Sequence, residues 1–148
     1  MRGDRYVRSG AKEKKSHMMI HMAVEGEIEE ALAVLDGYNR NAESINGIAV
    51  KTLIDLWHDK VIAHADEEEA SLYVEIKMAV PGMDATLLKL SRDHDLLRKL
   101  LVNLSTEYST HRDYAEMSMI NHTMLNILKI HSSDEMAMLS DCEENLST

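Results

Sequence analysis

The sequence contains one proline, no phenylalanine, six glycines and one cysteine in 148 residues. Proline and glycine disfavour helix interiors, and aromatic and β-branched residues favour strands. A chain poor in Pro, Gly and Phe but rich in Ala, Leu, Met, Glu and Lys is therefore predicted to be all-α. The single Cys142 excludes an internal disulfide and a cysteine-based zinc or iron–sulfur site. One cysteine also fits a reducing, cytoplasmic setting.

No run of apolar residues reaches the length of about 20 that a membrane-spanning helix needs, so we expect no membrane segment. Residues 1–15 carry six Arg or Lys against Asp4 and Glu13, but no apolar segment follows, which argues against a secretory signal. We predict that 1–15 is a basic, disordered tail. The formal net charge of the chain is −10, and an acidic body makes nucleic acid an improbable partner.

Four segments show apolar residues at helical spacing between turn-forming residues. The first begins near Glu13 to Ser16 and ends near Gly37 or frays toward Ala42. Asn46-Gly47 then marks a break. The other three are predicted at 48–80, at 84–108 with Asp84 as the N-cap, and at 114–139. We predict one domain over residues 16–141, an up-and-down antiparallel four-helix bundle, followed by a frayed C-terminus at 142–148.

The sequence His-Ala-Asp-Glu-Glu-Glu at 64–69 lies in the middle of the second helix. Residues four apart share one face of a helix, so His64 and Glu68 both fall on an apolar stripe that includes Trp57 and Leu72. Polar and charged groups on such a face are costly unless a partner compensates them. The stripe therefore indicates a buried metal site, while Asp66 and Glu69 are expected on the solvated face.

Every predicted helix has a histidine on its apolar stripe, and in two helices a glutamate follows four residues later. The histidines are His21, His64, His94 and His131, and the glutamates are Glu68 and Glu135. About one or two such pairs are expected by chance, and three occur, the third being His21–Glu25. Their recurrence on the stripes of alternate helices, rather than any single pair, predicts a metal centre.

This arrangement resembles the hemerythrin-like, or HHE cation-binding, domains over about residues 17–140. The resemblance implies two iron ions with a bridging oxo or hydroxo group, with zinc or manganese as possible substitutes. It implies as metal ligands His21, His64, Glu68, His94, His131 and Glu135. Mixed imidazole and carboxylate ligation also suits iron better than copper(I) or calcium. A ferritin-like site needs Glu-x-x-His, and no Glu here has a His three residues on.

The chain departs from the family's oxygen carriers in three places. Leu72-Tyr73-Val74 stands where the family typically has Leu-Phe-Pro, and Arg98 stands where the carriers have a second histidine one turn after the third-helix histidine. The last carboxylate is Glu135 at +4 rather than an Asp at +5. The pattern is more similar to a carboxylate-richer branch that includes the hemerythrin domain of an iron-sensing ubiquitin-ligase subunit.

The resemblance implies a protein that binds or senses dioxygen or a related redox species, with peroxide or nitric oxide as further small ligands. Two alternatives stay open: an enzyme that turns over peroxide or nitric oxide, and an iron sensor or reservoir. Oxygen carriage is the least favoured because of Arg98. No protein partner follows from the sequence.

Several nearby side chains have two interpretations. The first helix offers two candidate ligands, His17 and His21, and the repeat with His94 favours His21. His17 then lines the mouth of the site or hydrogen-bonds at its edge. Glu67 supports a ligand or faces solvent, and Glu25 is expected on the polar surface. Arg98 pairs with a carboxylate ligand or a bound peroxide, or it lies on the surface. Three further histidines fall off the stripes and are expected on the surface: His58, His111 and His122.

Overall fold

The fold is described from a computed structural model, with backbone at residues 2–37 and 43–147 and side chains at 14–37 and 43–145. In these ranges every regular element is a helix. The first is α1 (Arg2–Gly37), and the last two are α5 (Asp84–Ser109) and α6 (Tyr114–Ser147). Between them one long helix is wound in five parts: α2 (Glu43–Leu56), η1 (Trp57–Ile62), α3 (Ala63–Glu67), η2 (Glu68–Leu72) and α4 (Tyr73–Ala79).

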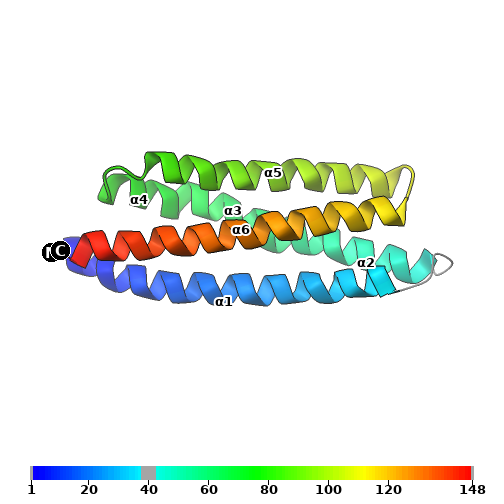
Figure 1. Ribbon diagram of the computed structural model, residues 1–148, viewed down its shortest axis with the longest axis horizontal. Helices are drawn as coiled ribbons and strands as arrows, with labels where there is room; N and C mark the ends of the chain where they lie inside the picture. Colours follow the sequence, from blue (N-terminus) through cyan, green and yellow to red (C-terminus); the bar gives the residue numbers. More distant parts are fainter. Residues whose placement is uncertain (1, 38–42, 148) are drawn as a thin grey trace.

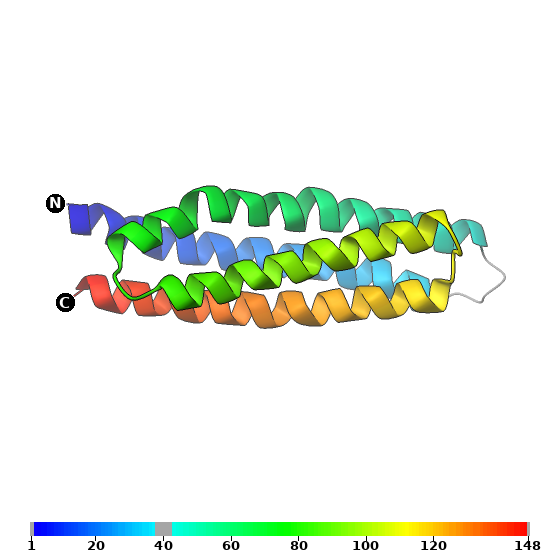
Figure 2. The same ribbon diagram turned by 90° about the horizontal axis from the view of Figure 1, so that it is seen from above.

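The four long helices run alternately up and down along one axis (Figure 1). In both views the N-terminal end of α1 and the C-terminal end of α6 lie at the same end of the bundle (Figures 1 and 2). α1 packs against α6 and α2, and α6 packs against α5. The predicted all-α, antiparallel four-helix bundle is confirmed.

Two apolar clusters fill the bundle, one on each side of a polar layer. One cluster includes Val61, Leu97 and Leu128, and the other includes Leu72, Leu90 and Met138. The second long helix, α5 and α6 each contribute one of these residues to each cluster. The predicted ligands of each helix lie in sequence between its two cluster residues. The histidine layer is therefore closed at both ends by side chains that exclude water.

The predicted stripes are buried as expected, but some helix ends differ from the prediction. α2 begins at Glu43, so Asn46-Gly47 lies within its first two turns, with the Asn46 side chain only 2% exposed. The first N–H groups of a helix need no intrahelical acceptor, so Asn and Gly cost less there than in a helix interior. Met83 is the N-cap of α5, and Asp84 is its first helical residue.

The first and last helices of the chain, α1 and α6, extend further than the apolar periodicity predicts. α1 begins at Arg2, because helix-forming Arg, Lys and Ala continue the helix without an apolar stripe to signal it. α6 continues past Leu139 to Ser147, and Cys142 is buried against the cluster that contains Met138. The predicted fraying toward Ala42 lies outside the described residues. The turn before α5 is confirmed, with Val80 extended and Gly82 at φ +90°.

No helix in the described part of the chain combines the length and the hydropathy needed to cross a bilayer.

Candidate metal centre

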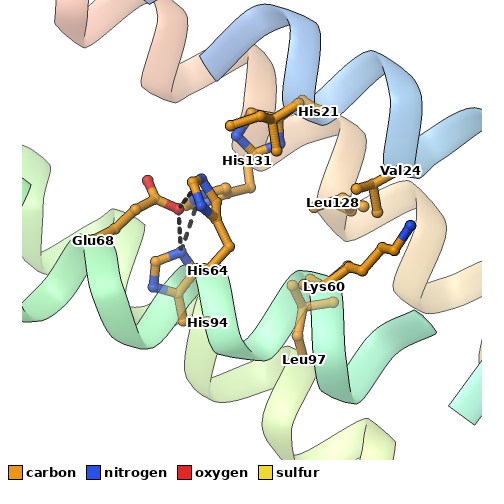
Figure 3. Close-up of a pocket in the computed structure, with 11 residues that line it drawn as sticks. His21, Val24, Lys60, His64, Glu68, His94, Leu97, Leu128 and His131 are labelled. Carbon is orange, nitrogen blue, oxygen red and sulfur yellow. Dashed lines mark hydrogen bonds and ion pairs between the residues drawn. The ribbon is translucent and has the colours of Figure 1, made fainter. Parts of the chain in front are cut away.

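The six predicted ligands converge at the centre of the bundle from all four long helices. His131 and Glu135 are each 1% exposed, and Glu68 and His94 are nearly as buried. His21 comes from α1, and His64 is the most exposed of the six, with a side chain 19% accessible. Figure 3 shows His21, His64, Glu68, His94 and His131 turned toward one another. Buried groups of this kind need compensating partners.

Each of the two carboxylates lies between histidines of different helices. Glu135 Oε2 is 3.3 Å from His131 Nε2, and Glu135 Oε1 is 3.4 Å from His21 Nε2. Glu68 Oε1 is 3.2 Å from His64 Nε2 and 3.9 Å from His94 Nε2. A carboxylate with imidazoles around both of its sides is placed to bridge two cations.

Hydrogen bonds at the far side of two rings set their orientation. His131 Nδ1 is 3.1 Å from Asp93 Oδ2, and His21 Nδ1 is 2.9 Å from Ser132 Oγ. The Ser132 hydroxyl can donate its proton to Leu128 O at 2.8 Å, so it accepts a hydrogen bond from His21. A ring that keeps its proton on Nδ1 in these hydrogen bonds would offer the Nε2 lone pair to a cation, which would replace the contact between Nε2 and Glu135.

Tyr73 contacts the centre, although the sequence analysis gave it no role. Its hydroxyl donates a 2.6 Å hydrogen bond to Glu135 Oε2. Its ring lies parallel to that of His94, with the centroids 5.8 Å apart and 3° between the planes. The signal in the sequence was a tyrosine in place of the family's phenylalanine, since the two differ by one hydroxyl that needs a partner when buried.

His17 lies within the cluster rather than at its mouth. The residue is 4% exposed, and its Nε2 lies 3.5 Å from Glu68 Oε2 and 3.7 Å from Glu135 Oε1. It is the one histidine within 4 Å of both carboxylates among the ion pairs of the described residues. Helical spacing placed His17 and His21 on one face, but only the register of α1 against α6 shows that both reach the centre.

The remaining candidates lie outside the cluster. Glu67 is exposed, and Glu25 Oε1 lies 3.1 Å from Ser132 Oγ. The Arg98 guanidinium is held by Asp66 at 2.6 Å, by Asp95 at 2.9 Å and by Glu69. Arg98 therefore faces three acids of the bundle surface, and Glu69 alone links it to the site, at 3.6 Å from His94 Nδ1. The surface position of three histidines is confirmed: His58, His111 and His122.

Burial shifts the protonation of the cluster. It lowers the pKa of His64 to about 4 and that of His94 to about 3, so both rings are neutral at pH 7. Burial and the neighbouring Glu135 raise the pKa of Glu68 to about 10. Burial alone would also raise the pKa of Glu135, but hydrogen bonds from His131 and His21 outweigh it and lower that pKa. Glu68 thus holds a proton that a cation can displace.

The donor set fits a bound cation pair. In the described part of the chain, two sets of donor atoms lie within 4.8 Å of one another: Glu68 with His94, His131 and Glu135, and Glu68 with His17 and His64. Buried Glu68 Oε2 and His64 Nε2 have no hydrogen-bond partner among the described residues. Buried polar atoms of this kind are costly in a native fold, and metal coordination would satisfy them.

A small cavity opens beside the cluster. Its volume of about 20 Å³ is lined by five of the predicted ligands and by the apolar side chains of Val24, Val61 and Leu97. A volume of this size holds about one water molecule. Lys60 lies on the same side, next to Val24 and Leu128 in Figure 3. The space admits a molecule of two or three atoms rather than an organic substrate.

The comparisons with known proteins agree with this geometry. A family model described as the hemerythrin HHE cation binding domain matches residues 18–139. No curated protein and no solved structure matches the chain. The matched range runs from α1 to α6 and contains all six predicted ligands.

Proposed function

The chain belongs to the hemerythrin HHE cation-binding domain family, and we propose that it holds two iron ions and uses them to bind or sense dioxygen or a related redox species. The observation that carries the proposal is the position of Glu68 and Glu135. Both buried carboxylates lie between histidines of different helices. Glu135 has an imidazole near each of its two oxygens. Glu68 has two imidazoles near Oε1 and a third near Oε2.

Each residue of the cluster has a proposed task. His21, His64, His94 and His131 supply nitrogen donors, and Glu68 and Glu135 bridge the two ions. Asp93 and Ser132 hold two of the rings so that Nε2 faces inward. The apolar walls of the cavity keep bulk water out and limit the ligand to a small molecule. Iron bound there supplies a reversible change of oxidation state, which the side chains alone cannot provide.

The donor set favours iron, manganese or zinc over calcium, magnesium and copper(I). Two carboxylates and at least four imidazoles suit iron, manganese and zinc, whereas calcium and magnesium prefer oxygen ligands and copper(I) prefers sulfur. Of the three metals that fit, zinc has no change of oxidation state, and the family resemblance implies iron. Zinc serves as a redox-silent probe of the same site.

Anaerobic loading with ferrous iron, followed by exposure to air, tests the proposal. We expect about two irons per chain and an optical band that changes with oxygen. His64→Ala should lower the iron count, whereas His58→Ala, at an exposed histidine of the same helix, should not. Fewer than two irons per chain in the unaltered protein, or equal counts in the two variants, would contradict the proposal.

The same loaded protein separates the two alternative functions. Peroxide or nitric oxide turnover that disappears on metal removal would identify an enzyme. A large rise in melting temperature on iron addition, with no turnover and no response to oxygen, would identify an iron sensor or reservoir. Reversible bleaching of the optical band on removal of oxygen would instead indicate oxygen carriage.

A further inference from the structure

We propose that Met18, Met19 and Met22 form a copper(I) site on the surface of α1, separate from the candidate metal centre. The site takes a soft, monovalent cation through three thioether sulfurs. It uses none of the residues assigned to the buried cluster, so its test is independent of the proposed function.

The three methionines are neighbours on the outer side of α1. Residues three and four apart lie next to each other on a helix, with Cβ atoms about 5–6 Å apart, so Met22 neighbours both Met18 and Met19. Their side chains are between 45% and 66% exposed. His21, which lies between them in sequence, is instead turned into the bundle (Figure 3). The three sulfur atoms can therefore reach one common point at the surface.

The buried methionines have a packing role that these three lack. Met117, Met124 and Met138 are at most 2% exposed and belong to the two apolar clusters. Elsewhere in the described part of the chain, the exposed methionines are Met78 on α4 and Met119 on α6, and neither has another exposed methionine within four residues. The described surface therefore gathers several thioethers in one helical turn only on α1.

Thioether sulfur determines which metal suits the site. It is soft, polarisable and uncharged, and ligands of this kind favour copper(I), whereas imidazole and carboxylate suit iron and zinc. Both histidines of α1 face the interior instead: His21 Nε2 lies 3.4 Å from Glu135 Oε1, and His17 Nε2 lies 3.5 Å from Glu68 Oε2. The surface donors therefore differ in kind from the buried donors, and the two sets should select different metals.

The helix fixes the spacing of the three sulfurs before the ion arrives. α1 packs against α2 and α6, so little backbone order has to be gained on binding. Each methionine side chain has three rotatable bonds and can adjust to the ion. Once one sulfur is bound, the other two are held close to the ion at a high effective concentration. Copper(I) should therefore bind this group more tightly than it binds an isolated exposed methionine.

Nuclear magnetic resonance with isotope-labelled methionine methyl groups tests the assignment residue by residue. Silver(I) serves as the probe, because it is a soft monovalent ion that air does not oxidise. We expect the methyl signals of the three α1 methionines to shift at silver concentrations at least ten times lower than those of Met78 and Met119. Shifts of both groups at the same concentration, or no shift on α1, would overturn the proposal.

Paired leucine variants measure the affinity for copper(I) itself. Competition with a coloured copper(I) chelator in the absence of oxygen should show at least a tenfold loss in Met18→Leu/Met22→Leu and no change in Met78→Leu/Met119→Leu. Leucine has a similar volume and helix propensity, and all four positions are exposed, so both variants should fold. Cys142 is present in every protein compared and cannot cause a difference between them. Equal affinities in the two variants would contradict the site.

Zinc titration separates this inference from the proposed function. Met18→Leu/Met22→Leu should bind zinc as the unaltered protein does, because the buried histidines and glutamates are intact. A loss of zinc binding in this variant would show that the methionines act on the buried centre, and it would overturn a separate site. If the unaltered protein binds neither zinc nor iron but the silver shifts on α1 persist, the proposed function fails and this inference stands.

Discussion

The Tyr73 hydroxyl donates a 2.6 Å hydrogen bond to Glu135 Oε2, the oxygen that also faces His131 Nε2 at 3.3 Å. One carboxylate oxygen thus has a phenol on one side and an imidazole on the other, in a layer almost closed to water. Such a contact holds the carboxylate in one orientation before any cation arrives. The preorganised geometry lowers the cost of assembling the site.

Tyr73→Phe tests the contribution of this hydrogen bond. The substitution keeps the ring beside His94 but leaves Glu135 Oε2 with one partner fewer, so we expect the metal-free protein to lose about 1–2 kcal/mol of unfolding free energy. The loss should shrink in the metal-loaded protein, where a cation satisfies the carboxylate. Urea unfolding of both forms measures it. Equal losses in the two forms would contradict this account.

Metal binding should release at least one proton near pH 7. The raised pKa of Glu68 keeps its carboxyl protonated in the metal-free protein, and that proton must leave when Glu68 binds a cation. His64 and His94, whose pKa values are lowered, are already neutral and release none. Affinity should therefore rise as the pH rises, by about tenfold per pH unit for each proton released.

Calorimetry of zinc binding in two buffers with different ionisation enthalpies measures this proton count. Glu67→Gln, at an exposed acid next to Glu68, should leave the count unchanged. A binding enthalpy that is independent of the buffer would show that Glu68 is already ionised in the metal-free protein.

Asp93→Asn tests whether the contact between Asp93 and His131 Nδ1 supports metal binding by the other ring nitrogen of His131. Asp93 Oδ2 lies 3.1 Å from His131 Nδ1, and loss of the carboxylate makes the imidazole less basic and less well oriented. Changes of this kind typically cost about 10–100-fold in metal affinity. Asp95→Asn is the control, because Asp95 lies on the same helix but pairs with Arg98. Equal zinc affinity in the two variants would argue against a supporting role.

Asn121→Leu addresses the stability of the bundle away from the metal centre. Trp57 Nε1 donates a 2.9 Å hydrogen bond to Asn121 Oδ1, and both side chains are 0% exposed. An apolar residue of similar size leaves the indole N–H without an acceptor, and we expect a loss of about 1–3 kcal/mol. Asn126→Leu, on the exposed side of α6, should change the unfolding free energy much less. Trp57→Phe should cost less in the Asn121→Leu background than in the unaltered protein, because it then removes an N–H that has already lost its acceptor.

The four-helix fold and most residues of the candidate metal centre could be predicted because the apolar stripe of each helix determines both. In α5 the stripe residues from Leu87 to Leu104 are buried as predicted, and His94 is buried among them. A polar residue at the phase of an apolar stripe points into the core whatever the neighbouring helices do. The sequence alone therefore indicated which histidines face inward.

The contacts between helices could not be predicted in the same way. His17 and His21 share a face of α1, and only the axial register of α1 against α6 brings His17 within 4 Å of Glu135. Tyr73 likewise gains its role from a residue 62 positions later in the chain. Arg98 had three acids within reach on the folded surface, and no spacing rule ranks them against the acids of the site.

The π-helical turns in the helix that carries His64 and Glu68 affect where this sequence can lose a residue without loss of the fold. The π segments η1 and η2 flank α3 on both sides, and each holds one residue more in its turn than an α-helix would. Deleting an exposed residue such as Asp59 from η1 can be absorbed by a return to α-helical winding, with the later residues keeping their directions. The same deletion within α5 would rotate every later side chain by about 100°. Single-residue deletions should therefore be tolerated better in η1 and η2, next to the candidate metal centre, than in α5.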